Sequence, residues 1–275
     1  MIQELSRILR CLADESKPLK MATLYILSDM DREHLPELEA IWDGLSVKRK
    51  RAVLRALVEL TEATVEVDFT TLFRFCLDDE DAEVRLLAIE GLWEDEDTWL
   101  VGPLVRLLRN DPQPAVRAAA AASLGRFVLL GELGEISASI GALAEQALLE
   151  AYFTPEEVLE VRRRALESVA YSGEAGVTDL IEEAYYEGDE RMRVSALFAM
   201  GRSADRRWRS ILIHELRSPS PAMRYEAAVA CGELELREAV RELSRLIDDG
   251  DTEVRDAAIE ALGKIGGAEA LRILE

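Results

Sequence analysis

The sequence has few of the residues from which chemical sites are built: three cysteines and two histidines among 275 residues. Cys11, Cys76 and Cys231 lie far apart among apolar neighbours, and no pair has metal or redox spacing, so we expect buried, reduced thiols. His34 and His214 are equally isolated, and the sequence contains no nucleophile motif or glycine-rich phosphate loop. These absences argue against an enzyme and predict neither a metal site nor a cofactor.

Long apolar runs are also missing. The longest, 127–130 and the alanine run 118–122, are far shorter than the roughly 20 residues of a membrane span. Residues 1–5 carry an early acid and lack the basic-then-apolar pattern of an export signal. No segment shows sustained alternation of β-branched residues, which excludes strands. We therefore expect an all-α, cytoplasmic protein without a membrane segment.

Positive charge is in deficit. The chain has 33 Lys and Arg against 54 Asp and Glu, a formal net charge of -21, and residues 61–190 account for -20 of it. Such a field repels phosphate backbones and attracts cations over roughly 8 Å at physiological salt. We expect a protein partner with basic character and no nucleic acid.

The sequence does contain a repeated signature, Arg-x-x-Ala with an apolar residue four positions after the alanine. Its six copies begin at Arg85, Arg117, Arg162, Arg193, Arg224 and Arg255. The last four arginines are 31 residues apart and the first two 32, and a fixed period of this length indicates stacked repeats. Apolar residues recur at helical spacing in and before each signature, which predicts an inner and an outer helix per unit. The predicted fold is an α-solenoid, a superhelix of helical hairpins.

Two features qualify the regular pattern. A glycine recurs eight residues after the signature arginine, at Gly125, Gly201, Gly232 and Gly263, and we expect it to end each inner helix in a left-handed conformation. The gap between Arg117 and Arg162 is about 14 residues longer than the period. We expect an extended helix end and a longer, protruding loop around residues 127–136 to take up the surplus.

We expect one domain over residues 1–275. Capping helices are predicted over 1–45, with helical segments at 2–12 and 18–27, about seven repeats over 46–265 including a degenerate copy at Arg49, and a C-terminal cap over 266–275.

The unit Asp-x-x-Val-Arg-x-x-Ala-x-x-x-Leu-Gly, clearest at 81–85 and 251–255, resembles the HEAT-like repeats, in the short variety of phycobilin lyase subunits and many bacterial proteins. In such families turn aspartates pair with helix arginines of neighbouring units. The resemblance therefore implies a ladder made of Asp81, Asp189 and Asp251 with Arg85, Arg193 and Arg255. Other residues replace the aspartate in three units, so the ladder is expected to be incomplete.

Three groups of residues are candidates for binding. The acidic clusters 78–81 and 94–97 either stabilise helix ends or receive a basic partner. Trp93 and Trp99 either pack between helices or form an interface. Arg126, Arg202 and Lys264 follow the recurring glycine and are expected along one edge, as helix-end cations or as a basic track. The predicted binding residues are Trp93, Glu94, Asp95, Glu96, Asp97, Trp99, Arg126 and Arg202. The basic run 48–51 with Arg55 is expected to be a solvated face.

These observations favour a non-enzymatic scaffold that holds a protein or peptide on a concave, largely acidic surface. One alternative, from the resemblance, is a phycobilin-lyase-like subunit that handles a tetrapyrrole. A second is a HEAT-like DNA glycosylase, which the negative charge disfavours. His214-Glu215 matches the pairs with which deoxyhypusine hydroxylases bind iron, but one pair cannot supply a di-iron site. The sequence indicates no oligomeric state.

Overall fold

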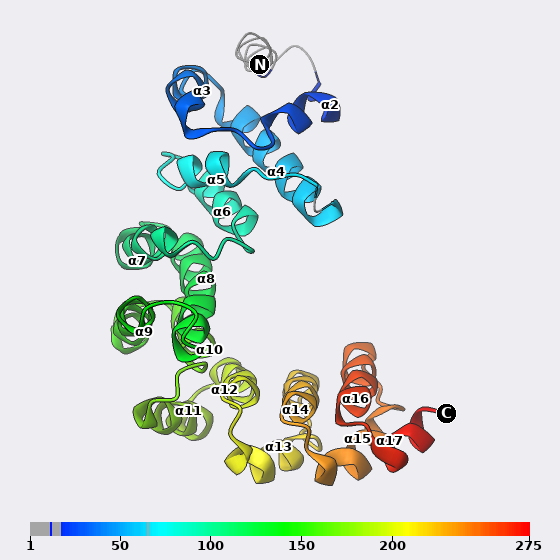
Figure 1. The fold of residues 1–275 in the computed structure, drawn as a ribbon. Helices are drawn as coiled ribbons and strands as arrows, with labels where there is room; N and C mark the ends of the chain where they lie inside the picture. The colour runs from blue at the N-terminus through cyan, green and yellow to red at the C-terminus, as the bar shows by residue number, and fades with distance from the viewer. Residues whose placement is uncertain (1–11, 13–17, 65) are drawn as a thin grey trace. The chain divides into compact units, whose positions relative to one another are not determined.

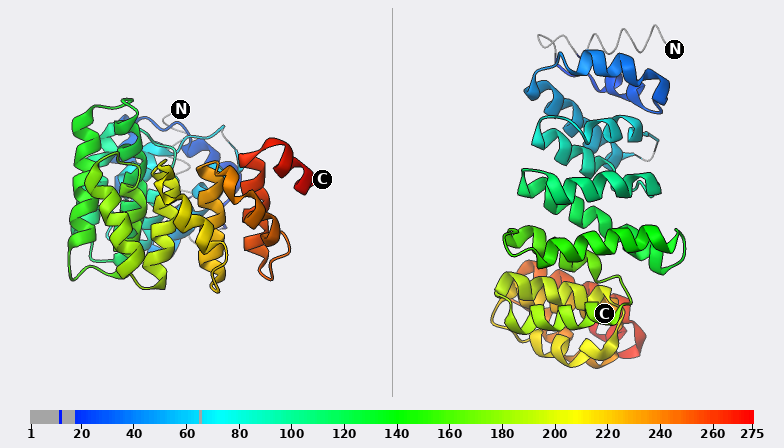
Figure 2. Two further views of the ribbon diagram at one scale, coloured as in Figure 1. Left: turned by 90° about the horizontal axis from the view of Figure 1, so that it is seen from below. Right: turned by 90° about the vertical axis from the view of Figure 1, so that its left-hand side faces the viewer.

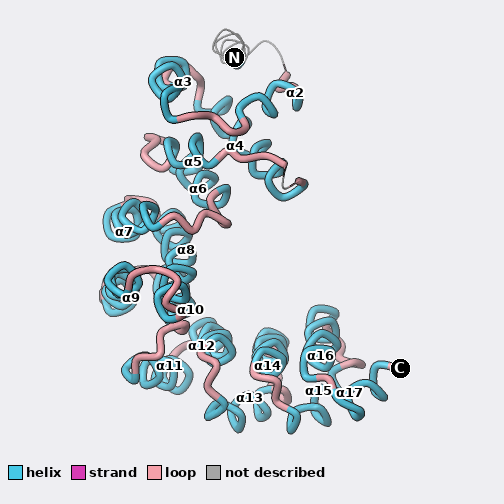
Figure 3. The backbone as a smooth tube through the Cα atoms, viewed as in Figure 1, coloured by secondary structure: helices cyan, strands magenta, loops and turns pink. Residues whose placement is uncertain are grey.

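A computed structural model describes residues 12, 18–64 and 66–275, and in these ranges the chain forms helices and connections without a strand (Figures 1 and 3). The predicted all-α fold is confirmed. The helix expected over 2–12 and Cys11 lie outside the described residues, apart from Leu12. Contacts divide the chain into two compact units, residues 1–123 and 124–275. The single domain stays a prediction.

Unit 1 begins with short helices and continues as hairpins (Figure 1). Its inner helices α4 and α6 pack against each other, and outer helix α5 packs on α6. Helix α4 carries Arg49 and stands where an inner helix of a seventh repeat belongs. The elements are α2 (Met21–Leu24), η1 (Tyr25–Leu27), η2 (Arg32–His34), α3 (Leu35–Trp42), α4 (Val47–Ala63), α5 (Thr70–Cys76), α6 (Ala82–Gly91), η3 (Thr98–Leu100) and α7 (Val101–Asn110). Helix α8 (Pro114–Glu132) follows, and the boundary between the units falls inside it.

Unit 2 is a row of hairpins whose inner helices α10, α12, α14 and α16 pack in chain order (Figure 2). Outer helices α11, α13 and α15 each pack on the inner helix that follows them. The elements after α8 are α9 (Ala138–Phe153), α10 (Leu159–Val169), α11 (Ala175–Glu187), α12 (Glu190–Arg202), η4 (Arg206–Trp208), α13 (Arg209–Glu215), α14 (Pro221–Glu233), η5 (Arg237–Ala239), α15 (Val240–Leu246), α16 (Thr252–Ile265) and α17 (Gly267–Leu274).

The signature arginine ties each inner helix to the turn before it. In four copies its guanidinium donates to the backbone carbonyl oxygen six residues earlier, at 2.7–2.8 Å. These copies are Arg85, Arg117, Arg224 and Arg255. A planar group with five fixed donors can hold a carbonyl and still offer other N–H groups to a second acceptor.

The second acceptor is a carboxylate in the turn of the next hairpin. Arg85 forms two hydrogen bonds with Asp111, at 2.6 and 2.9 Å, and Arg224 forms two with Asp249, both at 2.8 Å. Asp111 and Asp249 each also accept a backbone N–H two residues later, which shapes their own turn. One carboxylate thus fixes a turn and links two hairpins.

The ladder predicted through Asp81, Asp189 and Asp251 is wrong in its residues. These three aspartates cap the N-termini of their own helices α6, α12 and α16, where the carboxylate accepts backbone N–H groups. The acids that receive Arg85 and Arg224 lie six residues before the next signature arginine instead. Asp81 does bond across hairpins, but to Arg51.

The recurring glycines lie inside helices and do not end them. Among the described residues, only Gly134, Gly266 and Gly267 are glycines with positive φ. A Cβ added at Gly201 would lie 2.9 Å from the Cα of Ala230, and one added at Gly232 would lie 2.9 Å from the Cα of Ala261. Neighbouring inner helices therefore approach through a glycine against an alanine.

Longer helices take up most of the surplus between Arg117 and Arg162. Helix α8 has 19 residues and α9 has 16, whereas inner helices α12 and α14 have 13 each. The extended helix end is confirmed, but the protruding loop is wrong, because only residues 133–137 connect α8 to α9. Gly131 and Gly141 face each other so closely that a Cβ on Gly131 would lie 2.9 Å from the Cα of Gly141.

The basic run is only in part the solvated face that we expected, because Lys48 and Arg55 are exposed whereas Lys50 is largely buried in an ion pair. Lys50 pairs with Asp79 at 2.9 Å, with side chains only 12% and 4% exposed, and Arg51 pairs with Asp81 and Glu83. The acidic cluster 78–81 accounts for these ion pairs, because it lies in the turn that precedes α6, the inner helix packed against α4. The prediction for the cysteines is confirmed at Cys76 and Cys231, which are buried; burial raises the pKa of Cys231 to about 12.

Removing Arg85 tests the link between hairpins. Arg85→Ala leaves Asp111 charged with a side chain that is 2% exposed, so we expect the free energy of unfolding to fall by about 3–5 kcal/mol. Arg106→Ala removes an ion pair with Asp78 whose side chains are 52% and 71% exposed, and should cost less than about 1 kcal/mol. Urea denaturation of both variants measures the difference; equal losses would refute a structural role for the buried pair.

The glycine–alanine contact gives a second prediction. Gly201→Ala forces two helices apart and should lower the free energy of unfolding by about 1–3 kcal/mol. Gly263→Ala places the same methyl group where nothing lies within 4 Å, and should raise stability by up to about 1 kcal/mol through helix propensity. Thermal unfolding compares the two variants. A stabilised Gly201→Ala would show that the contact is not a constraint.

Candidate partner-binding site

A polar pocket of about 290 Å³ opens in unit 1 beside the end of α6. One wall is the segment that leaves α4 and enters α5, and the other is the loop after Gly91. The lining residues are Thr61, Thr64, Val67, Asp68, Phe69, Thr70, Gly91, Trp93, Glu94, Asp95 and Glu96. Four of the sequence-predicted binding residues, Trp93, Glu94, Asp95 and Glu96, thus line this pocket together.

Packing beneath the loop places Trp93 on the surface. A Cβ at Gly91 would lie within 2.5 Å of the Phe73 ring, so α6 can pass this ring only with glycine there. Leu92 is buried and anchors the next position, while Trp93 is 55% exposed and Trp99 is 48% exposed. Packing between helices therefore does not account for either tryptophan.

Arg74 holds half of the predicted acidic cluster. It forms two hydrogen bonds with Asp95, both at 2.7 Å, an ion pair with Asp97 at 2.9 Å, and its guanidinium lies 5.2 Å from the centre of the Trp99 ring. The backbone N–H of Trp99 and the Arg74 guanidinium together hold the pKa of Asp97 below its usual range. Asp95, Asp97 and Trp99 thus surround a cation that the chain itself supplies.

Glu94 and Glu96 are exposed, and within the described part of the chain neither forms an ion pair. On the last turn of α6, burial and the nearby carboxylate of Glu62 raise the pKa of Glu90. The pocket therefore has an excess of negative charge at its rim beside an exposed indole.

Arg126 and Arg202 do not join this pocket. Arg126 is half-buried, and its guanidinium lies 5.0 Å from the Phe127 ring centre. Arg202 lies 3.7 Å from Glu233, which also pairs with Lys264 at 2.7 Å. Because Glu233 separates the two cations, charge alternates along the edge formed by α12, α14 and α16, and the basic track is wrong there.

The His214-Glu215 pair is divided between two environments. Glu215 is buried, accepts the Tyr185 hydroxyl at 2.5 Å and lies 3.2 Å from Arg193, whereas His214 is exposed. Burial and then the bond to Glu215 raise the pKa of Tyr185 to about 12. Glu215 therefore links neighbouring hairpins of unit 2.

Sequence reasoning missed a polar network between α10 and α12. The buried Glu167 accepts the Ser195 hydroxyl at 2.6 Å and an Arg164 N–H at 2.8 Å, and Arg163 donates to the Ser195 oxygen at 2.8 Å. Ser195 is fully buried. The available signal was a polar residue at the second position after the signature arginine, where Leu87 and Ala257 stand in other copies.

Glu226, at that same position on α14, is half-buried near this network. Within the described ranges it forms no hydrogen bond or ion pair. Burial, and then the charge of Glu167, raise the pKa of Glu226 to about 7, although Arg202, Arg163 and Arg164 act in the opposite direction. Its ionised form is therefore unfavourable in the folded chain.

The raised pKa predicts a specific pH dependence. The penalty for ionised Glu226 is absent below pH 4.5, the ordinary pKa, and grows as the pH rises to about 7. We expect Glu226→Gln to match the unmodified chain at pH 4 and to exceed its stability by up to about 3 kcal/mol at pH 8. Urea denaturation at both pH values tests this, with Glu182→Gln, at an exposed position of α11, as the control for net charge. A gain that is equal at both pH values would contradict the assignment.

None of the helices in the described ranges combines the length and apolar character that crossing a bilayer requires. A comparison with curated protein sequences finds no match.

Solved structures with similar folds share little sequence with this chain. Importin beta matches with a TM-score of 0.50 and 14% identity over 95% of this chain and 41% of its own. YibA of Escherichia coli matches with a TM-score of 0.48 and 18% identity over 83% of this chain and 90% of its own. Human deoxyhypusine hydroxylase matches with a TM-score of 0.39 and 20% identity over 96% of both chains. At these identities the importin beta match supports the α-solenoid fold alone.

The family assignment comes from the sequence itself. The model of the HEAT repeats matches residues 70–148 and 209–275, which together exceed half of the chain. These ranges include Trp93 with the loop residues 94–96, and the hairpins that Arg224 links. The chain therefore belongs to the HEAT repeat family.

Proposed function

We propose that this protein is a non-enzymatic HEAT-repeat scaffold, and that the pocket beside Trp93 receives a lysine or arginine side chain of a basic protein segment. The observation that carries the proposal is an exposed indole next to two exposed carboxylates, Glu94 and Glu96, that have no ion-pair partner within the described residues.

The neighbouring Arg74 cluster supports this assignment by analogy within one loop. There, a tryptophan and two carboxylates two residues apart, Asp95 and Asp97, surround a guanidinium. Trp93 with Glu94 and Glu96 repeats that set of groups, and neither glutamate has an ion-pair partner in the described part of the chain. A cation over an indole gains about 0.5–2 kcal/mol, and more as the site is desolvated.

The charge of the surroundings supports a basic partner further. Residues 61–110 of unit 1 hold 13 acids and 4 bases, a net charge of -9, and Glu62 and Glu90 lie on the helices that border the pocket. Charge of one sign around a binding site increases the association rate of an oppositely charged ligand. We therefore expect tight binding at low salt that weakens as salt screens the field.

The experiment uses a fluorescein-labelled octalysine peptide and measures binding by fluorescence anisotropy at 50 and 200 mM NaCl. We expect the double variant Glu94→Lys/Glu96→Lys to bind the peptide about tenfold or more weakly and with a smaller salt dependence. Trp93→Leu should weaken binding about threefold or more without changing the salt dependence, because the indole carries no charge.

The matched control is Glu182→Lys/Glu187→Lys on α11 in unit 2, where both glutamates are exposed and the net charge changes by the same amount. It should retain most of the affinity. If both double variants lose affinity equally, binding of the peptide depends on the total charge of the protein, and the pocket is not the binding site.

A further inference from the structure

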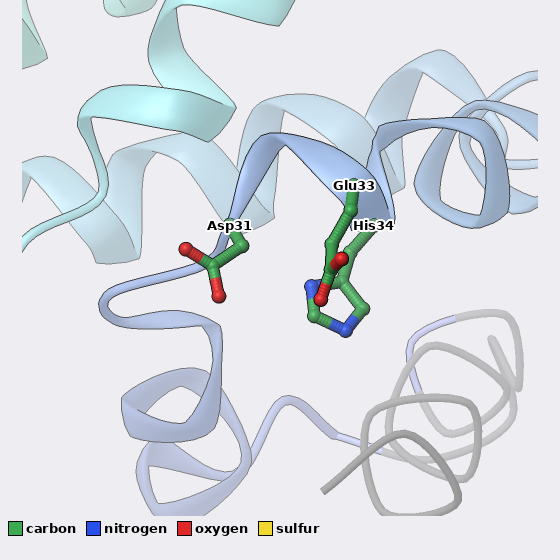
Figure 4. Close-up of side chains that lie close together, drawn as sticks. All are labelled: Asp31, Glu33 and His34. Carbon is green, nitrogen blue, oxygen red and sulfur yellow. The ribbon is translucent and has the colours of Figure 1, made fainter.

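Three potential metal ligands meet in the connection that precedes α3. Asp31, Glu33 and His34 each offer a ligand atom, and these atoms all lie within 4.8 Å of one another. Figure 4 shows the three side chains on the same side of the η2 segment. The backbone N–H of His34 donates to the carbonyl of Asp31 at 3.0 Å, and this turn brings residues 31 and 34 together.

The three side chains are not used elsewhere in the described structure. Asp31 stands at the N-cap position of η2, yet its side chain accepts no capping hydrogen bond. The side chains of Asp31 and Glu33 form no hydrogen bond or ion pair with a described residue. Elsewhere in unit 1, Asp79, Asp81, Asp95 and Asp111 are all paired.

His34 provides an independent reason to infer a ligand. Its Nδ1 atom is buried and has no hydrogen-bond partner within the described ranges. A buried polar atom in a folded protein nearly always has a partner, because leaving it without one costs about 1–3 kcal/mol. A metal ion bound at Nδ1 satisfies the nitrogen, and the two carboxylates balance the charge of the ion.

The donor set selects the class of ion. An imidazole with two carboxylates suits first-row divalent transition metals, and three protein ligands with a position left for water are typical of open zinc sites. Mg²⁺ and Ca²⁺ prefer sites made of oxygen ligands alone. We propose that Asp31, Glu33 and His34 bind one Zn²⁺ ion and that this ion fixes the turn before α3.

The test uses the full-length, untagged protein with Cys11→Ser, because a thiol outside the described residues would compete for zinc. Zn²⁺ is titrated in competition with a chromophoric chelator. We expect one Zn²⁺ per chain, affinity at least about tenfold weaker in His34→Gln, and similar losses in Asp31→Asn and Glu33→Gln. The other histidine supplies the matched control: His214→Gln should bind Zn²⁺ as the parent does.

Two further readouts distinguish a built site from a generally acidic surface. A hundredfold excess of Mg²⁺ should leave Zn²⁺ binding unchanged, and Zn²⁺ should raise the midpoint of thermal unfolding in the parent but not in His34→Gln. Equal binding by the parent and His34→Gln, displacement of Zn²⁺ by Mg²⁺, or absence of binding by the parent would each overturn the proposal. Because Asp31 and Glu33 are exposed, His34 is half-buried and none of the three side chains has a partner among the described residues, circular dichroism should show that the variants remain folded.

Discussion

The repeat depends on the guanidinium of the signature arginine. Arg85 and Arg224 each hold a carbonyl of their own turn and a carboxylate of the next one, so one side chain fixes both the hairpin and its neighbour. Lysine could not replace it, because a single ammonium lacks the planar fork that serves two acceptors at once. Burial of apolar surface favours the stacking of hairpins but does not fix their orientation. The directional hydrogen bonds of the arginine fix how each hairpin is oriented against the next.

This arrangement also determines which acids are available to a partner. The turn carboxylates that the chain needs are paired, as Asp111 and Asp249 show, and the same applies to Asp95 and Asp97 around Arg74. The exposed acids next to Trp93 belong to the loop and not to the ladder. In the proposed site, binding and folding would therefore use different carboxylates even within residues 94–97, and the binding surface could change without loss of the fold.

The fold was predictable from the sequence because period, polarity and helical spacing agree in most of the units. The aspartates of the ladder were not predictable from the sequence. An aspartate that caps a helix and one that bridges two hairpins lie only two residues apart in the same turn, and the sequence does not distinguish them. Which polar groups are buried could not be predicted from the sequence either. Glu226 resembles any solvent-facing glutamate until α10 and α12 are placed beside it, and Trp93 and Trp99 were open to two interpretations until Gly91 and Phe73 were seen to turn the loop outward.

The contact between neighbouring inner helices has a consequence for how such a protein grows. Helices α14 and α16 carry the same small-x-Gly element, Ala230-Cys231-Gly232 and Ala261-Leu262-Gly263, in which the alanine meets the preceding helix and the glycine of α14 meets the following one. Each unit thus contains both halves of its own interface. A 31-residue segment copied in tandem brings a ready-made junction with it, so gene duplication can lengthen the array without the invention of a new contact.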